Sequence, residues 1–368
     1  MRIKSITIEG LFGMFTHVIP LNQKEHITIL YGMNGMGKTM IFRIMDCFFL
    51  RKMEELVKLP FHTFTIVFEQ KTISVENTEN GYAIYDNGEK VRHLSELFSK
   101  ENFNTKTLEN IYPYLIETQR LLNLGTENNH AIIEHAKELA QKIQNLKQES
   151  DKRSNSLRVN LVERVANGQI NTGYSGEKLA EEIEKLNKRV EELKAVGLIE
   201  KDFKGYSWKT ENVNEIQRAI FSVNIQDTVQ ILAAFDEIYP KLALFVEILN
   251  ARRLVFKDIL IDEKEGFIII NENNKKLLLT ELSSGEQHEI ILLYLMLFEI
   301  PENALIMIDE PEISLHIDWQ ADFVNDLTEI IELRGFNVIL ATHSPDIVNG
   351  RSELTVSLNK QEKQMYAN

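Results

Sequence analysis

The chain has 368 residues, 43% of them apolar, which is enough to bury a large core divided into two or three lobes. Its 41 lysine and arginine residues against 55 aspartate and glutamate residues give a formal net charge of −14. This argues against a general coat for nucleic acid, although it leaves room for a local basic groove. The single cysteine, Cys47, excludes an intramolecular disulfide and is typical of a buried thiol in a reducing cytoplasm.

Membrane insertion is not expected. The longest apolar run, residues 290–298, has nine residues, whereas a membrane-spanning helix needs about 20. The opening stretch MRIKSITIEG is typical of a short strand and not of a signal peptide. We therefore expect a cytoplasmic protein that makes no membrane contact.

Short strands dominate the first part of the chain. They are predicted at residues 3–8 and 27–30, and the loop YGMNGMGKT (31–39) then leads into a predicted helix at 38–50. Further strands, 72–75 and 82–85, flank Asn80–Gly81, and Asn87–Gly88 follows. Both pairs are hairpin signals, so we expect an antiparallel sheet beside the strand–loop–helix unit.

The middle of the chain, from about 127 to 253, has a helical period. Its clearest signal is an apolar seam with spacings of 4, 3, 4 and 3, formed by Leu179, Ile183, Leu186, Val190 and Leu193. The seam covers only about two heptads, which favours a helical hairpin packed on itself over a partner-binding arm. Strands return at 254–261, 266–270 and 276–280.

The glycine-rich loop matches the pattern Gly-x4-Gly-Lys-[Ser/Thr] through Gly32, Gly37, Lys38 and Thr39. Glycines allow several backbone N–H groups to point at one anion, and the following helix adds its positive N-terminal end. Lys38 is expected to reach the outer phosphates of a nucleotide, and the Thr39 hydroxyl to bind Mg2+. The predicted binding residues are Gly32, Asn34, Gly35, Met36, Gly37, Lys38, Thr39 and Met40.

Two carboxylates end an apolar strand in the sequence LIMIDE, residues 305–310. A buried strand carries no charge in its body, so Asp309 and Glu310 fall at its carboxyl end, where open α/β sheets bind ligands. Asp309 is placed to hold Mg2+, and Glu310 to act as general base on an attacking water. A strand that simply runs into an acidic turn is the alternative.

The sequence LSSGEQ, residues 282–287, precedes a predicted helix at 289–298. Ser283 can cap this helix, and the helix start, with Gly285, can also bind a phosphate. We do not expect this element to face Lys38 of its own chain if the two lie at opposite ends of one nucleotide. Ser283 and Gly285 would then act on the nucleotide of a second subunit.

Two more polar residues follow apolar stretches. His343 ends the strand-like sequence VILATHS and is a candidate contact for the γ-phosphate. Gln119 follows YLIET and could bridge Mg2+ and the attacking water. A structural histidine and a surface glutamine are the alternatives. Phe12 and Phe15 are candidate adenine contacts, although core packing explains each of them as well.

The order of the phosphate loop, the glutamine, LSSGE, IMIDE and ATHS resembles the head of ABC-type ATPases. The sequence Asn34–Gly35 within the loop is similar to the RecF-like and chromosome-maintenance branch and unlike transporter heads. The sequences DEPE (309–312), SLH (314–316), LFGMF (11–15) and QRL (119–121) are similar to the OLD (overcoming lysogenization defect) group. The chain thus resembles the OLD/RecF/SMC-like (AAA15) group, including ATPase subunits of anti-phage systems such as Septu and PARIS.

The resemblance implies an α/β fold, namely an ABC ATPase head whose mixed sheet carries the phosphate loop, with an antiparallel β subdomain and a helical insertion. The implied domains are 1–125 with the phosphate loop and Q-loop, 126–253 as the insertion, and 254–368 with the signature, Walker B and H-loop. ATP and Mg2+ are the implied cofactors. Glu310, His343 and Gln119 are the implied catalytic residues, and the implied metal ligands are Thr39, Asp309 and Gln119.

The resemblance further implies an ATPase subunit of a bacterial anti-phage complex. It would form a homodimer or higher homo-oligomer through ATP and control a separate effector such as a nuclease. The chain ends 25 residues after His343, too few for the TOPRIM metal domain of OLD nucleases, so we expect any nuclease to be another polypeptide. Two departures stand out: Ser284 replaces the first signature glycine, and His316 stands where many ABC heads have aspartate.

Three alternatives remain at this point. A RecF/SMC-like ATPase of DNA repair or chromosome maintenance would bind DNA, which the acidic composition disfavours but does not exclude. A transporter's energising subunit is disfavoured by Asn34–Gly35 and by the insertion. A scaffold that uses ATP only to join subunits would combine normal ATP affinity with slow turnover.

Overall fold

The computed structural model describes residues 3–78, 81–91, 113–117, 125–167, 174–203, 205–208, 213–313 and 315–358. Packing divides the chain into two compact units. Unit 1 contains Met1–Gly125 and Leu295–Asn368, and unit 2 contains Thr126–Tyr294. Each is described by itself.

A parallel sheet positions the predicted site in unit 1. Its strand order within the described residues is β14–β3–β13–β12–β8. All neighbouring pairs are parallel, with Asp309 opposite Ala341 and Thr342 opposite Tyr31. The carboxyl ends of the three central strands therefore meet at one edge. The bounds are β3 (Ile27–Tyr31), β8 (Pro113–Glu117), β12 (Leu305–Asp309), β13 (Asn337–Thr342) and β14 (Thr355–Ser357).

The second sheet of unit 1 is antiparallel and has the order β2–β1–β4–β5–β6–β7 in the described chain. Asn87, with φ 50°, and Gly88, with φ 88°, form the two-residue turn between β6 and β7, as the Asn-Gly signal predicted. Asn80 lies outside the described residues. The strands are β1 (Ile3–Leu11), β2 (Phe15–Pro20), β4 (Thr63–Phe68), β5 (Thr72–Thr78), β6 (Gly81–Asp86) and β7 (Glu89–Val91).

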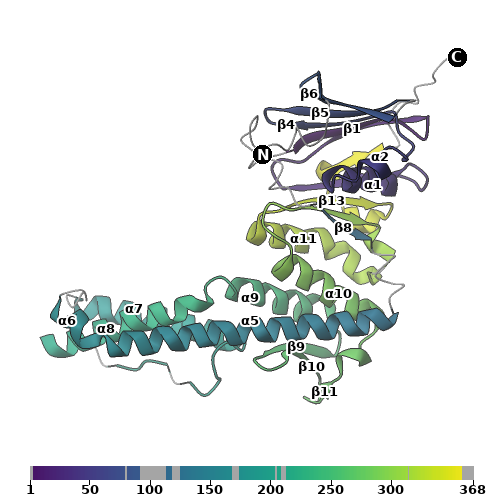
Figure 1. The fold of residues 1–368 in the computed structure, drawn as a ribbon. Coiled ribbons are helices and arrows are strands. Elements are labelled where there is room, and N and C mark those ends of the chain that lie inside the picture. The colour runs from purple at the N-terminus through teal and green to yellow at the C-terminus, as the bar shows by residue number, and fades with distance from the viewer. Residues whose placement is uncertain are drawn as a thin grey trace. The chain divides into compact units, whose positions relative to one another are not determined.

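The core of unit 1 joins the two sheets through α1 (Lys38–Phe49), which lies between them in Figure 1. Phe48 of α1 packs edge to face against Phe64 of β4, with ring centroids 5.3 Å apart. Cys47 is buried in the same cluster, and burial, reinforced by Asp46, raises the pKa of its thiol. The other helices described in unit 1 are α2 (Met53–Leu56), α11 (Ile317–Arg334), α12 (Pro345–Val348), the π-helix η4 (Leu295–Glu299), and the 3-10 turns η5 (Pro311–Ile313) and η6 (Ser352–Leu354).

Unit 2 is mainly helical, and α5 extends past α7, α8 and α9 in Figure 1. The apolar seam lies on α7 and is buried throughout, where α7 packs against α8, so the predicted helical hairpin is confirmed. The helices described in unit 2 are α5 (Gly125–Val159), α6 (Leu161–Ala166), α7 (Gly176–Ala195), α8 (Glu215–Leu232), η1 (Ala233–Phe235), α9 (Tyr239–Ile248), the π-helix η2 (Leu249–Arg253), η3 (Leu279–Glu281) and α10 (Ser284–Tyr294).

A small antiparallel sheet of unit 2 has the order β11–β10–β9, with β9 (Lys257–Asp262), β10 (Gly266–Asn271) and β11 (Lys276–Leu277). Gly266, with φ 78°, starts β10 so close to α5 that a Cβ there would lie 1.8 Å from the Ala136 carbonyl oxygen. Only glycine fits this approach of sheet to helix. The sheet therefore belongs to the same compact unit as the helices, whereas the sequence placed residues 254–294 with the last lobe.

The predicted α/β fold class is confirmed, since a phosphate-loop sheet, an antiparallel sheet and a helical region are all present. One predicted strand is much shorter than expected. Residues 276–280 were expected to be extended, but β11 ends at Leu277. The carboxylate of Glu281 accepts a hydrogen bond from the Leu278 backbone N–H at 2.8 Å, which closes the chain into the turn η3.

Candidate nucleotide site

The loop between β3 and α1 curls through two glycines in the left-handed region, Gly35 with φ 86° and Gly37 with φ 88°. Gly37 is the N-cap of α1 and supplies no side chain, and α1, which the structure describes in full, has no acidic residue in its first turn. The helix start therefore offers its backbone N–H groups and its positive end without a competing carboxylate. This arrangement suits an anion such as a phosphate.

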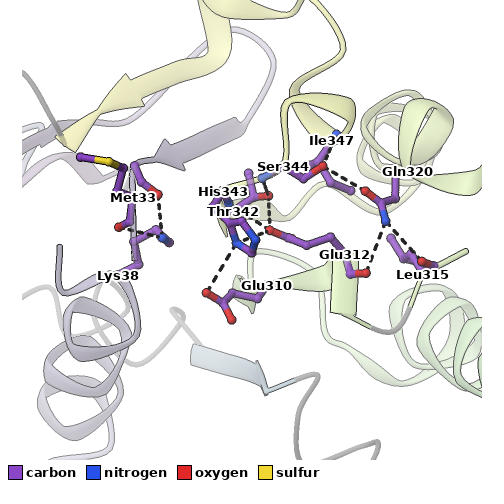
Figure 2. A network of polar contacts seen from close by, with 11 residues as sticks. Met33, Lys38, Glu310, Glu312, Leu315, Gln320, Thr342, His343, Ser344 and Ile347 are labelled. Carbon is purple, nitrogen blue, oxygen red and sulfur yellow. Dashed lines mark hydrogen bonds and ion pairs between the residues drawn. The ribbon is translucent and has the colours of Figure 1, made fainter. Parts of the chain in front are cut away.

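Lys38 is folded back over this loop and is only 5% exposed. Its Nζ donates hydrogen bonds to the Gly32 carbonyl oxygen at 2.8 Å and to the Met33 carbonyl oxygen at 3.3 Å, as Figure 2 shows. The ammonium group is thus held beside the loop's own backbone. A phosphate bound in the loop would lie within reach of the same group.

Thr39 connects the loop to the neighbouring strand. Its Oγ1 donates a hydrogen bond of 2.7 Å to Oδ2 of Asp309, at the end of β12. Asp309 is 9% exposed. The structure thus brings together two residues that are 270 positions apart in the sequence and that were both predicted as Mg2+ ligands. A hydroxyl and a carboxylate oxygen at this distance form the hard oxygen donor set that Mg2+ prefers.

A shallow cavity of about 250 Å3 lies over the loop and the start of α1. Glu310 also lines it, so the predicted general base and the predicted phosphate site share one cavity. Arg43 also lines it and was not assigned from the sequence; its position one turn after Thr39 on α1 was the available signal. The cavity is lined by Phe12, Asn34, Gly35, Gly37, Lys38, Thr39, Met40, Arg43 and Glu310.

A second hollow of about 270 Å3 is lined by Tyr31, Gly32, Met33, Asn34 and His343. Met36 makes a different contact, because its carbonyl oxygen lies 2.9 Å from Nε2 of the buried His17 on β2. Asn34 lines both the hollow beside His343 and the cavity beside Glu310.

Glu310 follows β12 with a φ of 48°, an unusual value for a residue other than glycine. Its backbone N–H donates to the Ala341 carbonyl oxygen at 2.9 Å, which ties the turn to β13. The carboxylate of Glu310 lies 3.8 Å from His343 Nδ1, beyond hydrogen-bond distance. The strained turn holds Glu310 at the mouth of the site.

Glu312 stands in the sequence DEPE, and the sequence predicted no role for it. It lies closer to His343 than Glu310 does. One of its oxygens, Oε1, is 3.0 Å from His343 Nδ1 and accepts hydrogen bonds from the His343 backbone N–H at 2.9 Å and from Thr342 Oγ1 at 2.7 Å. Figure 2 shows these contacts meeting at one point. Its place as the second glutamate of the sequence DEPE was the only signal for this residue.

The signature-like segment belongs to unit 2. Ser283 is exposed and starts α10 in a reciprocal cap, in which its backbone N–H and its hydroxyl both donate to Glu286 Oε2 at 2.9 Å. Burial alone would raise the pKa of Glu286, but hydrogen bonds from Lys257 and Ser283 hold it below its ordinary value. Gly285 lies in the same turn. The capping role predicted as an alternative for Ser283 is thus present.

Gln119 lies outside the described residues. The described part of the chain contains no group of three or more His, Cys, Asp or Glu side chains able to hold a metal ion, so Thr39 and Asp309 are the metal candidates there. No helix among the described residues combines the length and the apolar character needed to cross a membrane.

A family model described as "AAA ATPase domain" (AAA_15) matches residues 1–348. The chain belongs to this family. The AAA_15 match spans both compact units, so the helical region is part of the family pattern. Membership agrees with the way the structure brings Asp309 and Glu310 close to the phosphate loop.

Solved structures similar to this AAA_15 chain include the Smc head domain of Pyrococcus furiosus bound to the C-terminal domain of ScpA. It shows 14% identity and a TM-score of 0.44, with 94% of this chain and 90% of that chain covered. The SMC head domain of Thermotoga maritima shows 15% identity and a TM-score of 0.42, covering 96% and 92%. The recombination mediator protein RecF shows 13% identity and a TM-score of 0.35, covering 94% of each chain.

A curated relative is protein ea59 of Escherichia phage lambda, which is 29% identical over 88 residues. The matched segment covers 24% of this AAA_15 chain and 17% of the lambda protein. The similarity is therefore local and does not extend over the length of the phage protein.

Proposed function

We propose that this chain binds ATP with Mg2+ and hydrolyses it to ADP and phosphate. The observation that carries the proposal is the hydrogen bond between Thr39 and Asp309, which joins the phosphate-loop helix to the end of β12, next to Glu310. A glycine-rich turn that bound no ligand would give no reason for the Asp309 carboxylate to contact Thr39. AAA_15 membership supports the same activity.

The phosphate loop would bind the triphosphate through the backbone N–H groups at the start of α1, with Lys38 as the buried cation beside them. Mg2+, when bound, supplies charge neutralisation at the phosphate oxygens. Thr39 and Asp309 would hold it, and Gln119 is a further predicted ligand. Asn34, Gly35, Met36 and Met40 complete the predicted contacts of the loop.

Glu310 would act as general base, since it is the carboxylate on the cavity wall that faces the phosphate loop. Its side chain is 18% exposed, so water can reach it. His343 lines the neighbouring hollow beside Gly32 and Met33 and would contact the γ-phosphate from that side. The two residues would thus act from two hollows that both have Asn34 in their lining.

Two copies of the chain would associate through ATP, with Ser283 and Gly285 of one copy on the nucleotide of the other. Several exposed apolar side chains of unit 1, including Phe12 and Met33 on the walls of the two hollows, support self-association, because isolated subunits would leave them in water. They are Phe12, Met14, Met33, Ile313 and Ile317. Dimerisation would be the switch that controls a separate cytoplasmic effector in anti-phage defence, as the resemblance to the OLD group implies.

The test of hydrolysis compares phosphate release by the wild type with that of Glu310→Gln and Lys38→Ala. Glu310→Gln is expected to lower turnover at least about 100-fold while ATP affinity is retained, because only the base is lost. Lys38→Ala is expected to weaken ATP binding itself. The matched control is Glu332→Gln, at an exposed position of α11. Unchanged turnover in Glu310→Gln would contradict the proposal.

The defence role needs a separate test. The tagged chain is expressed from its native operon, pulled down, and sized by mass photometry with and without ATP. A co-purifying nuclease-like or toxin-like protein would support effector control. A chain that dimerises alone with ATP and retains DNA would instead favour a RecF/SMC-like role in DNA maintenance.

A further inference from the structure

We propose that Glu312 is the positioning residue for His343: it fixes the proton of the imidazole on Nδ1 and orients Nε2 toward the nucleotide site. The proposal deepens the function proposed above and rests on it for its kinetic consequences. It assigns to Glu312, and not to the adjacent predicted base Glu310, the task of holding the histidine.

The distances decide between the two carboxylates. His343 Nδ1 lies 3.0 Å from Glu312 Oε1 and 3.8 Å from Glu310 Oε1, and only the shorter value is a hydrogen bond. An ionised carboxylate can only accept hydrogen bonds, so Nδ1 must be the donor and carry the proton. The other ring nitrogen, Nε2, then points away from Glu312.

Glu312 is itself held firmly. Its side chain is only 7% exposed, and Oε1 also accepts hydrogen bonds from the His343 backbone N–H and from Thr342 Oγ1. One oxygen thus fixes both the ring and the backbone of the histidine. The burial of this carboxylate against the end of β13 supports a role beyond a surface ion pair.

A closed set of hydrogen bonds anchors the opposite end of Glu312, as Figure 2 shows. Thr342 Oγ1 accepts from the Ser344 backbone N–H at 3.0 Å, and Ser344 Oγ donates to Gln320 Oε1 at 3.0 Å. Gln320 Nε2 in turn donates to the Glu312 carbonyl oxygen at 3.3 Å. The circuit joins the segment after β12, the first turns of α11 and the end of β13, so Glu312 cannot turn away from His343 without breaking several bonds.

Glu310 is held by the histidine less closely than Glu312 is, since its Oε1 lies 3.8 Å from Nδ1, within ion-pair range but beyond hydrogen-bond distance. Because His343 Nδ1 is taken by Glu312, the carboxylate of Glu310 does not share that proton and stays directed at the cavity over the phosphate loop. The two glutamates of the sequence DEPE therefore have separate tasks: Glu310 faces the attacking water, and Glu312 holds His343, the phosphate contact. A carboxylate that fixes an imidazole tautomer typically affects the rate strongly without touching the substrate.

The kinetic test uses the full chain with Glu312→Ala, Glu312→Gln, His343→Ala and the double variant Glu312→Ala/His343→Ala. Glu312→Ala is expected to lower kcat about 10-fold or more while KM changes less than about 3-fold, because the orienting group is lost and the phosphate loop is intact. Glu312→Gln retains an acceptor oxygen and is expected to keep more activity. In the His343→Ala background, Glu312→Ala is expected to add less than about 3-fold.

The control is Glu332→Gln, the same chemical change on the exposed face of α11. Full additivity of Glu312→Ala and His343→Ala would overturn the proposal, because the two residues would then act independently. An equal loss of activity in Glu312→Gln and Glu312→Ala would also overturn it, provided that both variants bind ATP.

A second measurement does not depend on ATP hydrolysis. Nitrogen-15 NMR of histidine-labelled protein, with the His343 signal among the nine histidines assigned by its loss in His343→Asn, reports which ring nitrogen is protonated. A protonated Nδ1 in the wild type that changes in Glu312→Ala would support the proposal even if the chain proved not to hydrolyse ATP. An unprotonated Nδ1 in the wild type, or an identical spectrum in Glu312→Ala, would overturn it while leaving the proposed ATPase activity untouched.

Discussion

Gly37 and Gly35 have almost the same backbone conformation, with φ of 88° and 86°, but very different surroundings. A Cβ at Gly37 would lie 2.5 Å from Cδ2 of Leu11, which is fully buried, and 3.2 Å from the Phe12 ring. A Cβ at Gly35 would meet nothing within 4 Å. Gly37 is therefore required by packing against β1 as well as by its backbone angle.

This difference predicts unequal effects of two matched substitutions. Gly35→Ala is expected to cost about 1 kcal/mol of unfolding free energy, since it adds only left-handed strain. Gly37→Ala adds the clash with Leu11 and is expected to cost about 2 kcal/mol more. Urea unfolding of both variants without nucleotide measures the difference. Equal losses would show that β1 moves to accept the methyl group.

Glu312 has a proposed role that the sequence alone did not predict. Lys38, Thr39, Asp309 and Glu310 were predictable, because each stands in a short pattern whose chemistry requires that residue type. The contact between Glu312 and His343 depends on the parallel register of β12 and β13 and on the strained turn at Glu310, neither of which a pattern of neighbours records. Gln119 remains a prediction.

Among the elements, helix α7 was predictable from the sequence, whereas the end of β11 was not. Its seam spacing predicted a helix with one apolar face, and the structure confirms the face: Leu186 is 3% exposed and Leu193 is fully buried. The strands at 27–30 and 305–308 were predictable from their apolar character. The early end of β11 was not, because it depends on one hydrogen bond between Glu281 and the Leu278 backbone.

A substitution in the seam tests whether the seam stabilises the hairpin. Leu186→Ala is expected to lower the unfolding free energy by about 2–5 kcal/mol, because it leaves a cavity between packed helices. Lys188→Ala, two residues further along α7 and exposed, is expected to change it by less than about 0.5 kcal/mol. Denaturant unfolding followed by circular dichroism gives both values. A harmless Leu186→Ala would indicate that the seam serves a partner instead.

At the scale of the whole molecule, the predicted nucleotide-binding parts are divided between the two compact units. The phosphate loop, Asp309, Glu310 and His343 belong to unit 1, whereas Ser283 and Gly285 belong to unit 2. A site that needs both sets can be completed by a second copy of the chain. Association would then require ATP, and slow hydrolysis would preserve it.

Mass photometry tests this in the Glu310→Gln background, where bound ATP is expected to persist. With ATP and Mg2+, a species of twice 42.6 kDa is expected, and without ATP only the monomer. Adding Ser283→Arg should abolish the dimer, because a bulky cation at the start of α10 would block its approach to the partner's nucleotide. Ser207→Arg, the same change at an exposed serine elsewhere in unit 2, should leave it intact. A dimer that forms without ATP, or that survives Ser283→Arg, would place the contact between the copies elsewhere and exclude Ser283 from the nucleotide site.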